Sequence, residues 1–150
     1  LDYPSPEDEL LILQQDRNRN INANEQSIES PLTPATVLAA RQEVAAIHVE
    51  ESLERYIVSL VTATRQLGKW KQEWDGYLLA GASPRASIAL LRASSALAYL
   101  HGRDYVTPED IHDIAPDVLR HRLILDYACR VANINADDIT QHLLDVIPVP

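Results

Sequence analysis

Residues 81–102 read GASPRASIALLRASSALAYLHG, and this stretch decides the expected fold because it carries both ends and the body of one long helix. Ser83 is a preferred N-cap residue, and Pro84 suits the first helical position. Gly81 allows a sharp turn into the helix, and Gly102 stands where a left-handed C-cap belongs. The stretch predicts a central helix over residues 84–101, whose expected core positions are Ala86, Leu90, Ala93, Leu97 and Leu100.

The first turn of this helix places a forked cation at the positive end of the helix dipole. Arg85 directly follows Pro84, and the free backbone N–H groups of a first turn point toward the same spot. Such a site fits a phosphate, but an ion pair with an acid of a neighbouring helix would satisfy Arg85 equally well. Arg92 lies about 10.5 Å further along by helix rise, too far for the same phosphate oxygen, and is expected to form a salt bridge.

Composition favours a single all-α domain and argues against nucleic acid and membranes as partners. The chain has 150 residues, of which 46% are hydrophobic, and lacks Phe and Met, so its apolar residues are mainly the aliphatic ones that suit helix packing. A net charge of −9 opposes nucleic acid. Because the chain has no long apolar run, no signal-peptide pattern and one cysteine, Cys129, we expect a cytoplasmic protein that does not contact a membrane.

Ser/Thr-Pro pairs indicate where four helices start, and apolar spacing indicates the helix bodies. The pairs are Ser5-Pro6, Thr33-Pro34, Ser83-Pro84 and Thr107-Pro108, and Ser5 with Asp8 and Thr107 with Asp110 have the spacing of capping boxes. Helices are predicted over 6–16 and 108–115, from 34, from 50, around 118–125 and after Asn135, with a polar connection over 17–27 and an interruption at Pro116. The helix from 50 has an apolar stripe at Leu53, Tyr56, Ile57, Leu60, Val61 and Thr64.

Three further groups of residues have a functional and a structural interpretation. Trp70 and Trp74 either anchor a connector onto the bundle or form a hot spot for a protein partner. The basic cluster Arg120-His121-Arg122 has two interpretations: it could reach an acidic partner or a nucleotide edge, or it could be a solvated helix face. The scattered histidines lack the repeated carboxylate pattern of a metal site, so no metal ligand is assigned.

Several motifs resemble the C-terminal lid of MoxR-type AAA+ ATPases. The resemblance rests on residues 81–87 (GASPRAS), 102–111 (GRDYVTPEDI), Ala115-Pro116 and 118–122 (VLRHR). Residues 1–9 resemble the stretch that leaves the ATPase core of these proteins, and Tyr56-Ile57-Val58 with Ala63-Thr64-Arg65 resembles the helix before their second-sensor motif.

The resemblance implies a role for the first turn of the central helix. In such proteins the core holds ATP and Mg²⁺, and a second-sensor arginine of the lid is directed at the γ-phosphate; the matching residue is Arg85, with Ser83, Pro84 and Ala86 beside the nucleotide. The Walker motifs are absent from this chain, so we expect no ATP hydrolysis by it alone and no tightly bound cofactor. We expect a single lid over 1–150, in which 1–33 is a first helix and polar connection from the core and 34–150 is the main bundle.

The resemblance also implies a setting for the parent protein. It would be a ring, expected to be a hexamer, that couples ATP hydrolysis to the maturation or activation of client proteins, often with von Willebrand factor A domain proteins. The alternative is a free-standing helical adaptor that binds a protein partner without nucleotide, through its acidic surface and the segment of Trp70 and Trp74.

Overall fold

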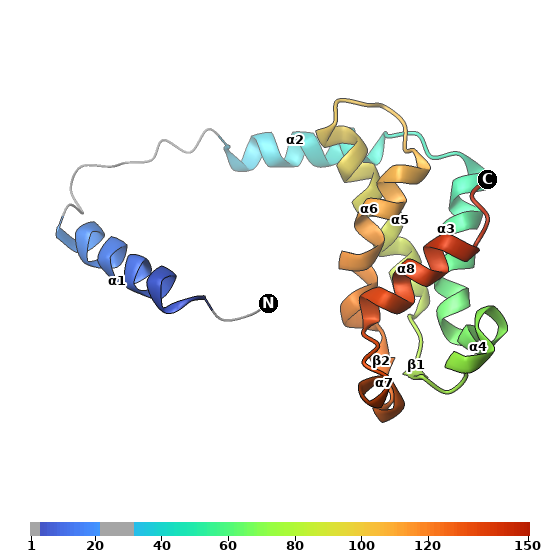
Figure 1. Cartoon of the computed structure of the whole chain (residues 1–150). Coiled ribbons are helices and arrows are strands. Elements are labelled where there is room, and N and C mark those ends of the chain that lie inside the picture. Colours follow the sequence, from blue (N-terminus) through green and yellow to red (C-terminus); the bar gives the residue numbers. More distant parts are fainter. Residues whose placement is uncertain (1–3, 22–31) are drawn as a thin grey trace. The chain divides into compact units, whose positions relative to one another are not determined.

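The computed structural model describes residues 4–21 and 32–150, and the chain divides into two units, Leu1–Thr36 and Val37–Pro150. Its helices confirm the all-α prediction (Figure 1). The helices are α1 (Pro6–Ile21), α2 (Pro34–Ala45), α3 (Glu51–Ala63), α4 (Leu67–Trp70), α5 (Pro84–Leu100), α6 (Pro108–Leu119), α7 (Tyr127–Val131) and α8 (Ala136–Val146). The 3₁₀ turns are η1 (Thr64–Gln66), η2 (Gln72–Trp74) and η3 (Arg120–Arg122), and the strands are β1 (Leu78–Ala80) and β2 (Ile124–Leu125).

The helix starts agree with the sequence. Each proline of the four Ser/Thr-Pro pairs is the first residue of a helix, in α1, α2, α5 and α6. The capping box of Thr107 and Asp110 forms at the start of α6, and Asn135 forms a second box with Asp138 at the start of α8. These short polar side chains take the N–H groups that a first helical turn leaves unpaired.

The helix α1 begins as predicted but ends later. Ser5 Oγ accepts a hydrogen bond from the Asp8 N–H at 3.2 Å, and three acids in the first turn suit the helix dipole. The helix continues to Ile21 because a started helix propagates readily through polar residues. The predicted connection over 17–27 is therefore wrong for 17–21, and the rest of it lies outside the described residues.

The core of the second unit is built by four helices. Figure 1 shows α3, α5 and α6 side by side, and α8 lies against α3 and α6. The apolar stripe predicted for α3 is confirmed in full: Leu53, Tyr56, Ile57, Leu60, Val61 and Thr64 are all buried.

The buried face of α5 differs from the prediction in its second half. Ala86 and Leu90 are fully buried as expected, but Leu100 is 77% exposed. From Ala86 and Leu90 the buried positions continue in steps of four to Ser94 and Ala98. The small side chains of Ser94 and Ala98 let α3 and α6 approach α5 closely, so α5 keeps the same face toward both helices.

The C-terminal part corrects three expectations. Pro116 does not interrupt α6, because a proline removes only one backbone donor and the buried Val118 and Leu119 hold the last turn in the core. The helix predicted over 118–125 is wrong, since its second half is η3 and β2. Strand β2 pairs antiparallel with β1, with Leu78 opposite Leu125; neither this strand pair nor α7 was predicted.

The turn between α5 and α6 is held by an ion pair whose carboxylate is buried and whose guanidinium is partly buried. Gly102 has φ of 71°, and the Arg103 N–H donates to the Ala98 carbonyl at 3.0 Å, which completes a Schellman C-cap. Arg103 then grips the carboxylate of Asp110 with two hydrogen bonds of 2.7 and 2.5 Å. Burial alone would raise the pKa of Asp110, but the hydrogen bonds from Arg103 and Thr107 hold this pKa below its ordinary value.

Candidate functional site

The start of α5 presents Arg85 to solvent, and no residue in the described part of the chain pairs with it. Ser83 has the extended N-cap conformation, with φ of −81° and ψ of 168°, and Pro84 occupies the first turn as predicted. The side chain of Ser83 makes no capping hydrogen bond, which corrects the expected role of its hydroxyl. Within residues 4–21 and 32–150, Arg85 is exposed and forms no hydrogen bond or ion pair.

Neither of the ion pairs considered for Arg85 and Arg92 on α5 is present in the described part of the chain. The ion pair that would have given Arg85 a structural role is absent there, so its guanidinium keeps its donors available. The salt bridge expected for Arg92 is also absent among these residues, and Arg92 is exposed.

The loop before α5 is fixed to the end of α3. The hydroxyl of Thr64 accepts a hydrogen bond from the Ala82 N–H at 2.9 Å, and Arg65 Nε donates to the Ala82 carbonyl at 2.7 Å. Both backbone polar groups of Ala82 are thus bonded to consecutive residues at the α3–η1 junction. Ala82 itself is fully buried. We call these three residues, Thr64, Arg65 and Ala82, the loop clamp.

Gly81 allows the close approach that the loop clamp needs. A Cβ atom at Gly81 would lie 2.6 Å from the Thr64 carbonyl oxygen and 2.8 Å from the Arg65 backbone nitrogen. Both neighbours are backbone atoms that cannot rotate away. Gly81 was expected to allow a sharp turn, whereas in the structure its lack of a side chain allows this contact with the end of α3.

The loop clamp was not predicted, although the sequence contains one signal for it. Tyr56 and Thr64 are the two members of the α3 stripe that carry a hydroxyl, and Thr64 is the one with an aliphatic hydroxyl. A buried hydroxyl is almost always hydrogen-bonded, so a threonine in an apolar stripe indicates a polar contact to another segment or to its own helix. The sequence does not reveal that Ala82 is the partner.

Comparison with known proteins identifies the class of domain. Residues 75–143 match the AAA lid domain family. The chain is 34% identical to chaperone MoxR1 of Mycobacterium tuberculosis over 99% of its own length and 38% of that protein. It is also 34% identical to protein MoxR of Methylorubrum extorquens, over 77% of this chain and 35% of that protein.

A solved structure agrees with these relatives. The crystal structure of a protein assigned as an ATPase from Cytophaga hutchinsonii superposes with a TM-score of 0.82 and is 37% identical, covering all of this chain and 45% of that one. The chain carries a MoxR-type AAA lid domain. The resemblance seen in the sequence is thereby confirmed, and the chain spans less than half the length of each of these three proteins.

The basic cluster of the lid is engaged internally. Arg120 Nε donates to Asp137 at 2.8 Å, and Arg120 Nη1 donates to Asp117 at 3.1 Å. Arg122 donates to the Val118 carbonyl and contacts His121. Because both guanidinium groups have partners, the structure does not favour an open site for a nucleotide or an acidic partner on η3.

The two tryptophans of the lid have different environments. Trp74 is 7% exposed, stacks on Tyr77 and meets His142 edge-on at 4.9 Å between ring centroids, so it anchors the connector to the core. Trp70 is 39% exposed. The hot-spot interpretation is wrong for Trp74, because a partner cannot reach this ring without unpacking the core.

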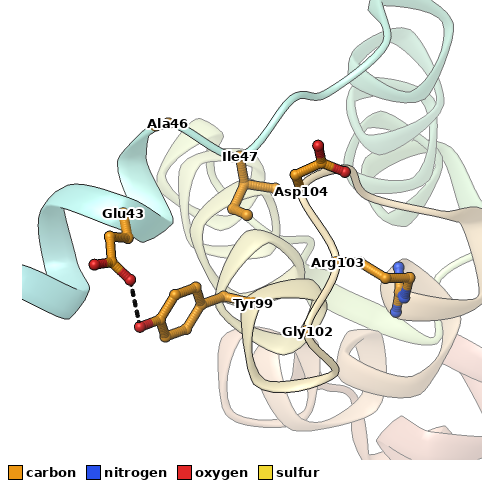
Figure 2. Close-up of a pocket in the computed structure, with 7 residues that line it drawn as sticks. All are labelled: Glu43, Ala46, Ile47, Tyr99, Gly102, Arg103 and Asp104. Carbon is orange, nitrogen blue, oxygen red and sulfur yellow. Dashed lines mark hydrogen bonds between the residues drawn. The ribbon is translucent and has the colours of Figure 1, made fainter.

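Two other features of the lid carry no assigned role. An open hollow of about 650 Å³ lies between α2 and the end of α5, where Tyr99 donates a hydrogen bond of 2.6 Å to Glu43 (Figure 2). Cys129 is fully buried as expected, and burial raises the pKa of its thiol.

No helix in the described ranges is both long and apolar enough to cross a membrane.

Proposed function

We propose that this lid closes over ATP bound to an AAA+ core and that Arg85 senses the γ-phosphate as a second-sensor arginine. The observation that carries the proposal is a guanidinium in the first turn of α5 that has no partner among residues 4–21 and 32–150, directly after a loop whose backbone is clamped. A forked cation and the positive end of a helix dipole together favour a dianionic phosphate group. Ser83, Pro84 and Ala86 would lie beside the nucleotide, with the uncapped hydroxyl of Ser83 as an additional donor.

The chain's own part in the reaction is electrostatic and positional. In phosphoryl transfer, negative charge spreads over the oxygens of the terminal phosphate, and a positioned arginine stabilises this charge. Arg85 would make this contact while the γ-phosphate is present and lose it after hydrolysis and phosphate release, so the closed position of the lid would be favoured only with ATP bound.

The described part of the lid offers no cluster of metal-ligating side chains. Among residues 4–21 and 32–150, no group of three or more His, Cys, Asp or Glu side chains is placed to hold a metal ion. We therefore assign ATP and Mg²⁺ to the core of the parent protein, where Mg²⁺ would screen the phosphate charge, and we assign no Mg²⁺ ligand to this chain.

The wider setting of the proposal rests on the relatives. MoxR1 of M. tuberculosis is named as a chaperone. We propose that the parent is likewise an ATPase of the cytoplasm that forms a ring, expected to be a hexamer, and acts on client proteins together with von Willebrand factor A domain proteins. The lid would contact the core of its own polypeptide and neighbouring subunits of the ring.

Measuring ATP hydrolysis tests where the activity resides. We expect the full-length protein to release phosphate from ATP, and we expect the isolated 150-residue chain to release none above background, because the phosphate-cradling loop is not in its sequence. Phosphate release by the isolated chain, or none by a well-folded full-length protein under several client and salt conditions, would contradict the proposal.

A further inference from the structure

We infer that Thr64 is a positioning residue for Arg85: its buried hydroxyl sets the loop before α5 and thereby the place of the guanidinium. This inference rests on the sensing role proposed for Arg85. Thr64 is 1% exposed, donates to the Val61 carbonyl at 2.7 Å and accepts from the Ala82 N–H at 2.9 Å. One hydroxyl thus joins the last turn of α3 to a loop 18 residues further along the chain.

The contact to Ala82 has no ready substitute. Ala82 is fully buried, so its N–H cannot turn to bulk water if the Thr64 hydroxyl is removed. An unpaired buried N–H is costly, and the loop is expected to shift until this donor finds a new acceptor. Arg65 Nε would still hold the Ala82 carbonyl from the adjacent position.

A shift at Ala82 is transmitted to Arg85 over a short, stiff path. Only Ser83 and Pro84 separate the two residues, and the proline ring fixes one of the backbone torsions between them. On the other side of Arg85, Ala86 is fully buried in the core. Arg85 is therefore an exposed side chain between two buried backbone anchors, and moving one anchor rotates the first turn of α5.

The test is Thr64→Val in the full-length protein. Valine keeps the shape and removes the hydroxyl, so we expect kcat for ATP hydrolysis to fall by about 10- to 100-fold, the size of effect that a displacement near 1 Å produces. The KM for ATP is expected to change by less than about threefold, because the lost contact is strongest in the transition state. Thr64→Ser retains the hydroxyl and is expected to restore kcat.

The lid contains a matched control for a buried threonine. Thr140 is also 1% exposed, but its hydroxyl donates only to the Ala136 carbonyl of its own helix, at 2.8 Å. Thr140→Val therefore removes a buried hydroxyl without freeing a donor in the loop, and kcat should be unchanged. An equal fall of kcat in Thr140→Val and Thr64→Val would overturn the inference, because the effect would then be one of general stability.

A double-mutant cycle separates this inference from the sensing role itself. If Thr64 acts through Arg85, Thr64→Val with Arg85→Ala should be no slower than Arg85→Ala alone. Additive losses, or a normal kcat for Thr64→Val beside a slow Arg85→Ala, would overturn the positioning role and leave the sensing role standing. Normal turnover by Arg85→Ala would overturn both.

A second variant keeps the test decisive if Thr64→Val does not fold. Arg65 is exposed, so Arg65→Lys should fold while it keeps the charge and loses the Nε donor to Ala82. We expect a lower kcat that is again absent in the Arg85→Ala background. A normal kcat in Arg65→Lys would mean that the loop clamp does not set the position of Arg85.

Discussion

Arg85→Ala in the full-length protein is expected to lower kcat for ATP hydrolysis by about 10²- to 10³-fold, the effect of removing one preorganised donor from developing charge. The physical reason is that alanine leaves the first turn of α5 intact but removes the only positively charged side chain of residues 81–87. Steady-state phosphate release at saturating ATP measures this effect. Binding of ATP should weaken much less, because the core supplies most contacts to the nucleotide.

The same helix provides the control for this prediction. Arg92 is exposed and without an ion pair in the described part of the chain, and it lies two turns beyond Arg85. Arg92→Ala should therefore leave kcat within about twofold, the range of an ordinary surface substitution. Arg85→Lys keeps the charge without the fork and should fall between wild type and Arg85→Ala. Near-normal turnover by Arg85→Ala would refute the sensing role.

Asp110→Ala is expected to lower the free energy of unfolding by about 3–5 kcal/mol, as removal of one partner from a buried ion pair does. Asp110 is 2% exposed and has no access to water that could replace its contacts. Its loss leaves the Arg103 guanidinium partly buried without a counter-ion and removes the bond of 2.8 Å from the Thr107 N–H at the start of α6. Urea unfolding of the chain measures the change.

Asp137→Ala is the matched control. Like Asp110, Asp137 lies in the first turn of a helix, α8, and pairs with an arginine. Its bond to Arg120 is 2.8 Å long, but both side chains are about half exposed. An exposed pair contributes little, so Asp137→Ala should lower the free energy of unfolding by less than about 1 kcal/mol. Equal losses in Asp110→Ala and Asp137→Ala would show that the turn between α5 and α6 does not depend on the buried pair.

The pH dependence of stability follows from the same carboxylate. Because its folded pKa is lowered, Asp110 contributes stability that is present above its unfolded pKa of about 3.9 and is lost as pH falls through the folded pKa. The wild-type chain should therefore lose stability below about pH 4 more steeply than Asp110→Asn does.

Local signals made the helix starts and the main core face predictable. The prolines at 6, 34, 84 and 108 and the short polar residues before them act within one turn, so the sequence alone is enough to locate them. The prediction of the apolar stripe of α3 was also correct, because both ends of that helix lie against the same core. The place of Arg85 on α5 was predictable for the same local reason, whereas its role remains a prediction.

Features that depend on tertiary contacts were not predictable. The pairing of β1 with β2 joins Leu78 to Leu125, and neither short strand has enough length for an alternating pattern. Pro116 was expected to break α6, but burial of Val118 and Leu119 outweighs the loss of one hydrogen bond. The contact of Thr64 with Ala82 depends on how α3 and α5 pack, which no local spacing encodes.

The most direct test of the sensing role of Arg85 is an experimental structure of the full-length protein with Mg²⁺ and a non-hydrolysable ATP analogue. We expect a guanidinium nitrogen of Arg85 to lie about 2.7–2.9 Å from an oxygen of the γ-phosphate, the distance of a charge-assisted hydrogen bond. The loop clamp should be intact, with Thr64 still bonded to Ala82. A γ-phosphate contacted only by the core, with the lid closed and Arg85 paired to a carboxylate or facing solvent, would contradict it.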